Sequence, residues 1–325
     1  MMPPSSLRSF PPEGEALPKR IALTVGPVLY HWPRQAMLDF YAAVAETPAD
    51  SVVLGDTVCA RRRELKTDDW LALARDLAAE GKEVVLATQT LVESEADLRL
   101  VRRYAEQGEF MVEAGDASAL QALAGARPFV LGPHINVYSR AALVEHAALG
   151  ALRWVAPVEL ALDAIALVNP PAERVRNPAG EAIATEVFAW GRLPLAFSAR
   201  CFTARHHGLN KDDCAFRCMD DADGLLVASG EGQPFLVVNG TQTQSAATQC
   251  LIAHGAALRA AGVARLRLSP GAQGFAEVVQ RFDAVINRGA DAAPALQALA
   301  ALAPPGGLAD GFAARRPGLE WSRAA

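Results

Sequence analysis

The stretch "SVVLGDTVCARRRELKTDDWLALARDLAAEGKEVVLAT", residues 51–88, decides the fold. It begins with SVVLG and ends with EVVLAT, two short apolar runs that are typical of parallel strands buried on both faces. Between them, apolar residues recur at helical spacing, Thr67 or Asp68 is placed to cap a helix, and Gly81 is placed to end it. The stretch therefore predicts a strand, a helix and a second strand parallel to the first.

Apolar runs of the same kind recur through the first half of the chain. By residue 157 they predict six strands, at intervals of about 20–33 residues, with helical patterns between them. Six such units with right-handed connections favour an α/β fold, a single (β/α) barrel-like domain with parallel strands, over an open sheet. No G-x-G-x-x-G motif follows the first strand, which argues against a dinucleotide-binding fold. The other four runs are IALTV (21–25), FMVEA (110–114), FVLG (129–132) and RWVAP (153–157).

The pattern changes in the second half of the chain. Strand-like runs at 185–197, 234–240 and 264–270 precede an Ala-rich stretch at 289–303 that predicts a closing helix. Between the first two runs lies a segment with little periodicity, and long loops of this kind in compact domains are usually functional or disordered.

These patterns divide the chain into three parts. We expect residues 1–19, which are rich in Pro and Ser, to form a flexible N-terminal extension. Residues 20–304 form the barrel-like domain, whose cysteine-bearing extended segment, residues 199–234, lies at the C-terminal rim. We expect residues 305–325 to be a tail that packs on the domain.

Composition points to a reducing compartment. The 325 residues are 51% hydrophobic, and the net charge is −5 with mixed signs throughout. This balance, and the lack of a long basic stripe, argue against nucleic-acid binding. Five cysteines are too few, and odd in number, for a disulfide scaffold. Because the sequence shows no signal-peptide core and no charge-free apolar stretch of roughly 20 residues, we expect a cytoplasmic protein without a transmembrane segment.

Three cysteines gather in "ARCFTARHHGLNKDDCAFRC", residues 199–218, with the spacing C-x12-C-x3-C. Four thiolates hold a [4Fe–4S] cluster or a structural zinc ion. Zinc sites usually have C-x2–4-C pairs in both halves, whereas here one pair is split by twelve residues and the fourth ligand is isolated, so the spacing modestly favours iron–sulfur. The fourth ligand is either Cys59, which follows a strand end, or Cys250. Cys250 lies in an apolar stretch that predicts a helix, where a buried thiol with no metal is the usual outcome. Inert core thiols are the alternative for the three late cysteines, but their charged surroundings argue against it.

Basic side chains accompany these cysteines. A cluster held by four thiolates carries a net negative charge, which nearby cations and hydrogen bonds compensate. Each arginine by itself is equally typical of a solvated surface, but as a group they suit an anionic cluster or substrate. The arginines are Arg61, Arg62, Arg63, Arg200, Arg205 and Arg217. Weaker candidates for polar site groups are His134, Asn136, His206, His207, Glu113 and Glu159.

Four stretches resemble the UbiV branch of the collagenase-like peptidase family. They are GDTVCARRRELKTDDWLALARDLAAEGKEVVLAT, LPLAFSARCFTARHHGLNKDDC, NGTQTQSAA and RLSPG. The similarity begins near residue 20 and runs to the C-terminus. The resemblance implies one [4Fe–4S] cluster, held by an isolated early cysteine and a C-x12-C-x3-C motif, and it matches no ligand position to Cys250. The implied ligands of the cluster iron are Cys59, Cys201, Cys214 and Cys218.

The resemblance also implies a function in anaerobic ubiquinone biosynthesis. Members of this branch pair with a UbiU-like paralogue, which carries its own cluster, as a heterodimer. Together the two chains are expected to hydroxylate the aromatic ring of ubiquinone precursors without O₂, so this chain is expected to be a subunit of the hydroxylase. A UbiT-like lipid-binding protein is an associated partner. A cluster near a barrel rim is compatible with electron transfer.

Three other functions remain open at this point. The family name suggests a peptidase, but no nucleophile–base or metal-hydrolase motif accompanies it. Other branches of the family hydroxylate RNA, which the acidic balance of this chain argues against. The third alternative is a zinc-stabilised scaffold, which would be colourless and redox-silent.

Overall fold

A closed barrel of eight parallel strands forms the centre of the molecule. The computed structural model describes residues 20–322, so the N-terminal extension predicted at 1–19 lies outside the described residues. β11 pairs with both β1 and β7, which closes the barrel. The strands are β1 (Ala22–Val25), β2 (Ser51–Leu54), β3 (Glu83–Ala87), β4 (Met111–Ala114), β5 (Phe129–Leu131), β6 (Ala151–Val155), the first part of β7 (Ala184–Phe197) and β11 (Arg265–Leu268). The predicted barrel fold is confirmed.

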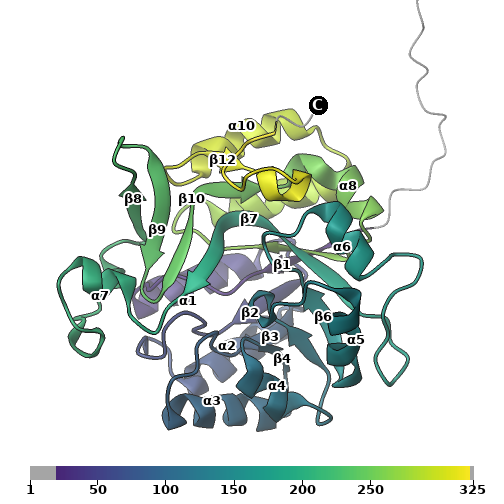
Figure 1. The fold of residues 1–325 in the computed structure, drawn as a ribbon, viewed down its shortest axis with the longest axis horizontal. Coiled ribbons are helices and arrows are strands. Elements are labelled where there is room, and N and C mark those ends of the chain that lie inside the picture. The colour runs from purple at the N-terminus through teal and green to yellow at the C-terminus, as the bar shows by residue number, and fades with distance from the viewer. Residues whose placement is uncertain (1–19, 323–325) are drawn as a thin grey trace, which may run out of the picture.

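Helices follow the first six strands and β11, and they lie around the outside of the barrel (Figure 1). α2 shows why: Trp70, Ala74 and Leu77 share one face at helical spacing, and that face is buried against the strands. Side chains of Ser94, at the start of α3, and Ser139, at the start of α5, cap these helices. The cap predicted for α2 at Thr67 or Asp68 is wrong, because α2 begins at Thr67, Lys66 is its N-cap, and Asp69 accepts a hydrogen bond from the backbone N–H of Lys66. The helices are α1 (Arg34–Ala45), α2 (Thr67–Ala79), α3 (Glu95–Glu106), α4 (Ala117–Leu123), α5 (Arg140–Ala148), α6 (Leu162–Val168) and α9 (Phe275–Phe282).

An antiparallel extension is inserted between β7 and β11. The second part of β7 leaves the barrel and pairs with β10 (Gln242–Cys250), which in turn pairs with β9 (Pro234–Asn239). β8 (Leu225–Ala228) completes this sheet. The short helix α7 (Phe202–His206) precedes it, and Figure 1 shows β8, β9 and α7 on one side of the barrel.

The helix predicted around Cys250 is wrong. Cys250 is the last residue of β10 and pairs with Trp190 of β7, and the helix α8 begins only at Gly255 (Gly255–Ala260). The small apolar residues before Cys250 suit a strand and a helix equally, and the long-range pairing with β7 decides between them. The interpretation of Cys250 as a buried thiol is confirmed, because its side chain is fully buried in the core.

The chain closes with α10 (Ala292–Leu302), the helix that the Ala-rich stretch predicts, and β12 (Leu308–Ala309), which pairs with β10. Beyond β12, the carboxylate of Asp310 lies 2.8 Å from Nε2 of His254. Among residues 20–322, no helix has the length and apolar character needed to span a bilayer.

Charged side chains share the barrel interior with a small apolar cluster. Arg267 forms a bidentate pair with Glu113, at 2.5 and 2.9 Å, and donates from Nε to Glu186 at 2.6 Å. Arg153 pairs with Glu83 at 2.7 Å and lies 3.5 Å from Glu186. The apolar cluster beside this network consists of Val53, Val85, Ala87, Val130 and Val155. Glu113, a candidate rim carboxylate from sequence, thus has a structural partner inside the barrel.

Candidate metal centre

Cys59 lies on the loop that follows β2, at the C-terminal rim of the barrel. The loop starts at Gly55, where φ is +134° and a Cβ would lie 2.6 Å from the carbonyl oxygen of Ala87, so only glycine fits without strain. Farther along, the hydroxyl of Thr241 donates to the carbonyl of Val58 at 2.5 Å. The hydrogen bond from Thr241 holds Val58, the residue before Cys59, against the turn between β9 and β10.

Arg62 joins three separate segments beside Cys59. Its side chain is only 3% exposed, and it donates to the carbonyl of Leu29 at 2.6 Å and to Oδ1 of Asn239 at 2.7 Å. Asn239 donates to the same carbonyl of Leu29 at 2.8 Å. The loop after β1, the loop after β2 and the β9–β10 turn are therefore held together by one buried cation.

Cys201 reaches the same turn from the other side. It precedes α7, is buried, and its sulfur accepts a hydrogen bond from the backbone N–H of Ala204 at 3.4 Å. The N–H of Phe202 donates to the carbonyl of Gly240 at 2.8 Å, and the N–H of Gly240 donates to the hydroxyl of Thr203 at 2.9 Å. Cys59 and Cys201, which are far apart in sequence, therefore flank one turn.

Cys218 completes a group of three neighbouring thiols. Its sulfur lies 3.5 Å from Nδ1 of His31, a buried side chain on the loop after β1. The ring of Phe216 packs edge-on against His31, with 5.5 Å between ring centroids. Burial, reinforced by the positive charge of Arg62, lowers the pKa of His31 to about 4, so the imidazole beside Cys218 is neutral at pH 7.

Cys214 lies between two short 3-10 turns on the same segment. Just before it, Asp212 pairs with Arg61 at 3.0 Å, which holds the segment against the Cys59 loop. The two residues after it, Ala215 and Phe216, both have left-handed backbone, with φ of 48° and 52°. Consecutive non-glycine residues in this region are strained, and such strain persists only where the surroundings enforce it.

The electrostatics of the thiols confirm that three of them are neighbours. Burial raises the pKa of both Cys59 and Cys218, and the nearby guanidinium of Arg62 opposes that rise in both. The proximity of Cys201 contributes further to the rise in the pKa of Cys59 and of Cys218. Burial raises the pKa of Cys250 to about 12, and none of the other cysteines contributes to that shift. All five cysteines are free thiols.

The thiols do not form a ready-made site for a single ion. Within residues 20–322, no three His, Cys, Asp or Glu side chains are grouped so that they could hold one metal ion. A structural zinc ion needs four donors around one centre, whereas each thiolate of a [4Fe–4S] cluster binds a different iron and the sulfurs stand farther apart. The Nε of Arg62 is buried without a hydrogen-bond partner, an unused donor beside two of the thiols. The four-cysteine ligand set stays a prediction.

The remaining candidates lie elsewhere or have other partners. Arg200, Arg205 and His206 are exposed on or near α7, and Arg217 pairs with Asp220 at 2.9 Å. Glu159 accepts a hydrogen bond from the hydroxyl of Tyr138, and Asn136 is exposed. His134 lies at the barrel mouth, where burial lowers its pKa to about 4.

Sequence reasoning missed His31 and Asn239 as neighbours of the thiols. Asn239 had a usable signal, since an Asn-Gly pair between apolar runs predicts a tight hairpin turn, which is where it lies. His31 had none, because it follows the first strand without any motif.

Comparison with known sequence families gives a match over most of the chain. The sequence profile of Peptidase family U32 matches residues 37–323. Among solved structures, the U32 peptidase Mk0906 superposes with a TM-score of 0.42 and 12% identity, over 80% of this chain and 96% of that chain. A phospho-2-dehydro-3-deoxyheptonate aldolase from Thermotoga maritima gives 0.37 and 12%, over 85% and 73%. The spore cortex-lytic enzyme SleL of Bacillus megaterium gives 0.39 and 10%, over 83% and 75%. Likenesses this distant carry no argument about function.

Proposed function

The chain belongs to peptidase family U32, and on that premise we propose that it is an iron–sulfur protein that works with a UbiU-like paralogue. The proposed activity of the pair is O₂-independent ring hydroxylation of ubiquinone precursors. The family membership is shared by proteins of several activities, so the finer proposal depends on the cysteine site and on the resemblance of its motifs to the UbiV branch.

One observation carries the proposal. Cys59 is separated from Cys201 by more than a third of the chain, yet both flank the turn at Gly240 and Thr241. The buried guanidinium of Arg62 lies near Cys59 and Cys218. In the apo protein burial keeps Cys59 and Cys218 as neutral thiols, although the guanidinium of Arg62 near both would favour thiolates. A cofactor that binds thiolates provides a reason for the arrangement.

Four side chains would hold the cluster: Cys59, Cys201, Cys214 and Cys218. When bound, a [4Fe–4S] cluster supplies one-electron transfer at a potential set by charge, hydrogen bonds and solvent exposure. The chain's own residues set these conditions. Arg62 would place a positive charge near the thiolates. Neutral His31 lies against Cys218, and the ring of Phe216 packs on His31.

The other candidate functions have less support. The family name is the only argument for a peptidase. A zinc scaffold would usually have C-x2–4-C pairs in both halves, and here only Cys214 and Cys218 form such a pair. The net charge of −5 argues against an RNA substrate.

The test is ubiquinone formation under strict anaerobiosis. The chain and its UbiU-like partner are co-expressed in a host that lacks both, and ubiquinone and its unhydroxylated precursors are quantified by mass spectrometry. We expect Cys59→Ser and Cys218→Ser to abolish ubiquinone formation and Cys250→Ser, the matched control, to retain it. Ubiquinone at wild-type levels with Cys59→Ser, or loss of ubiquinone with Cys250→Ser in a folded protein, would refute the proposal.

A further inference from the structure

β8 (Leu225–Ala228) is the free edge of the antiparallel extension, and Figure 1 shows the β8–β9 hairpin projecting beside the barrel. In an antiparallel pair, alternate residues of an edge strand point their backbone N–H and C=O groups away from the neighbouring strand. β8 pairs with β9 alone, and within residues 20–322 no other group forms a hydrogen bond with the backbone of Leu225–Ala228. A row of backbone donors and acceptors therefore stands open along β8.

This edge has few of the features that protect natural edge strands, which are charged residues, proline, bulges and a covering helix or loop. Residues 225–230, LLVASG, contain no charge and no proline. The register with β9 is irregular only after Val227, so Leu225–Val227 form a regular edge. These three residues are half-buried, and Phe235 on the adjacent strand β9 is 56% exposed. An apolar edge of this kind is open to pairing with another chain.

The open backbone groups of β8 determine what kind of occupant fits. A lipid or an apolar helix face would cover the side chains of β8 and would bury its backbone donors and acceptors without partners, which costs free energy. An added strand covers the side chains and also pairs with the backbone. The occupant that fits this edge is therefore an extended segment of polypeptide.

We infer that β8 is the edge on which the UbiU-like paralogue docks, an inference that rests on the proposed function. A paralogue shares the fold, so its own antiparallel extension ends in an equivalent edge. Two equivalent edges related by a pseudo-twofold axis pair antiparallel and merge the two extensions into one sheet. The β9 strands of the two chains then lie three strand spacings apart, roughly 14 Å.

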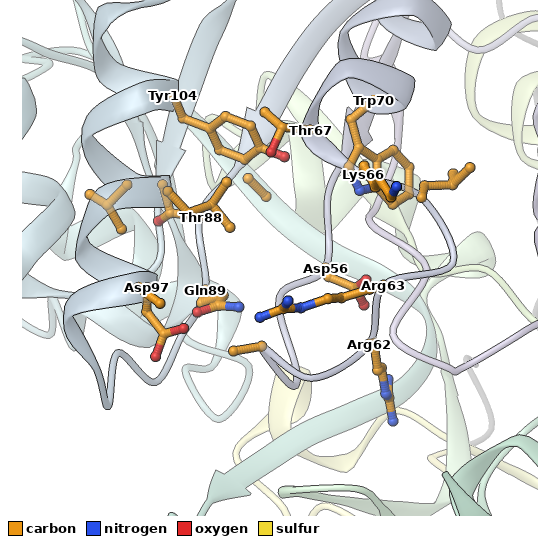
Figure 2. Close-up of a pocket in the computed structure, with 16 residues that line it drawn as sticks. Asp56, Arg62, Arg63, Lys66, Thr67, Trp70, Thr88, Gln89, Asp97 and Tyr104 are labelled. Carbon is orange, nitrogen blue, oxygen red and sulfur yellow. The ribbon is translucent and has the colours of Figure 1, made fainter.

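The course of β9 favours the paralogue over a second copy of this chain. β9 leads from the edge into the candidate metal centre, where it ends at Asn239, which accepts a hydrogen bond from Arg62 at 2.7 Å. Figure 2 shows Arg62 pointing away from the cavity of about 270 Å³ that it borders, in keeping with this bond to β9. The next residues, Gly240 and Thr241, bond to the segments that carry Cys201 and Cys59. Because the proposed partner carries its own cluster, one sheet through both β9 strands would connect the two metal centres.

Hydrogen–deuterium exchange of the full-length chain, free and in the purified complex with its paralogue, tests the inference. We expect the amides of Leu225–Ala228 that point away from β9 to exchange at least about tenfold more slowly in the complex, because each gains a backbone hydrogen bond. The helix α5, which Figure 1 shows on the other side of the barrel, is the internal control and should not change. Unchanged exchange of Leu225–Ala228 in the complex, or protection of all these amides already in the free chain, overturns the inference.

Substitutions locate the docking edge. Val227→Lys places a charge on β8, which is the device that natural sheets use against strand addition, and we expect it to weaken binding of the paralogue at least about tenfold. Val144→Lys, the same substitution at a 44% exposed position of α5, is the matched control and should leave binding unchanged. Phe235→Ser, at a side chain that is already exposed, is a second variant that should fold normally and weaken binding in the same direction. Unaltered binding of the paralogue by both Val227→Lys and Phe235→Ser refutes this location.

The same experiments separate this inference from the proposed function. A wild-type chain that forms no complex with the paralogue contradicts both. A complex that forms normally and survives both edge substitutions contradicts the docking edge alone and leaves the proposed function standing. A homodimer of the free chain that Val227→Lys dissociates would mean that a second copy occupies the edge, and it too overturns the inference.

Discussion

Replacing Arg267 with methionine tests the charge network in the barrel. The guanidinium is 3% exposed and holds two buried carboxylates, Glu113 by a bidentate pair and Glu186 at 2.6 Å. Burial by itself would raise the pKa of Glu186, but Arg267 and Arg153 hold it below its usual value. Methionine keeps much of the volume of the arginine stem and removes the charge, so both carboxylates lose a partner while the barrel stays filled.

The expected cost is large at neutral pH. Removing one partner of a buried ion pair typically costs 3–5 kcal/mol, because the remaining charge is buried without compensation. A natural domain has only about 5–15 kcal/mol of stability in total. We therefore expect the free energy of unfolding of Arg267→Met at pH 8 to be about 3–5 kcal/mol below that of wild type.

The loss should depend on pH in a defined direction. In wild type, the lowered pKa of Glu186 contributes stability above the carboxyl's unfolded pKa, and that contribution disappears as pH falls through the folded pKa. Without Arg267, burial raises the folded pKa of Glu186, so the variant recovers stability as this carboxyl takes up a proton. The difference between variant and wild type should shrink from pH 8 to pH 5.

Urea unfolding followed by circular dichroism measures both effects. The matched control is Arg75→Met, because Arg75 forms a bidentate pair of similar geometry with Glu109, at 2.6 and 2.8 Å, on the surface. Solvent screens that pair, so its loss should change stability little. Equal effects of the two substitutions, or a difference for Arg267→Met that does not vary with pH, would contradict the reasoning.

Three further predictions concern the loops that carry the candidate site. Asp56 has a folded pKa of about 7, above its unfolded value, so its contribution to stability is present at low pH and is lost as pH rises. We therefore expect Asp56→Asn to match wild type near pH 4 and to be more stable than wild type at pH 8 by up to about 4 kcal/mol. Urea titrations at both pH values measure the difference. Ala215→Gly should relieve the left-handed strain at φ 48° and raise the stability of the apo protein by about 1 kcal/mol, and a lower midpoint would contradict this. Gly55→Ala should destabilise the protein more than Gly81→Ala, since a Cβ at Gly55 meets the Ala87 carbonyl at 2.6 Å and one at Gly81 meets nothing within 4 Å. Equal melting temperatures of these two variants would exclude the clash at Gly55.

The early strands were predictable because each is a continuous apolar run between helical patterns. A strand buried on both faces can be predicted from its own sequence, without knowing which strand it pairs with, as SVVLG and EVVLAT show. β7 and β10 are different. β7 (Ala184–Phe197) starts inside the barrel and ends in the antiparallel extension, and β10 takes its form from pairing with β7 and β12. Such long-range pairing leaves no alternation of apolar and polar residues in the local sequence. The sequence around Cys250 therefore indicated a helix.

The sequence indicated that Cys59 and Cys201 lie close together, but not which groups support them. Cys59 follows β2 at the rim of the barrel, as the parallel-strand rule predicts. Cys201 follows the end of β7 that lies in the antiparallel extension, and it reaches the Cys59 loop through the β9–β10 turn. The hydrogen bonds among Arg62, Leu29 and Asn239 span up to 210 positions of sequence and depend on side-chain geometry. No spacing in the sequence encodes them, nor the approach of His31 to Cys218.

Iron and acid-labile sulfide per chain, measured after anaerobic purification, test the account's central claim most directly. The account predicts one [4Fe–4S] cluster in wild type and in Cys250→Ser, and loss of iron and sulfide together when any of the four proposed ligands is replaced by serine. The four substitutions are Cys59→Ser, Cys201→Ser, Cys214→Ser and Cys218→Ser. A colourless wild-type protein that holds zinc without sulfide, or a Cys59→Ser protein that keeps its full iron and sulfide, would contradict it.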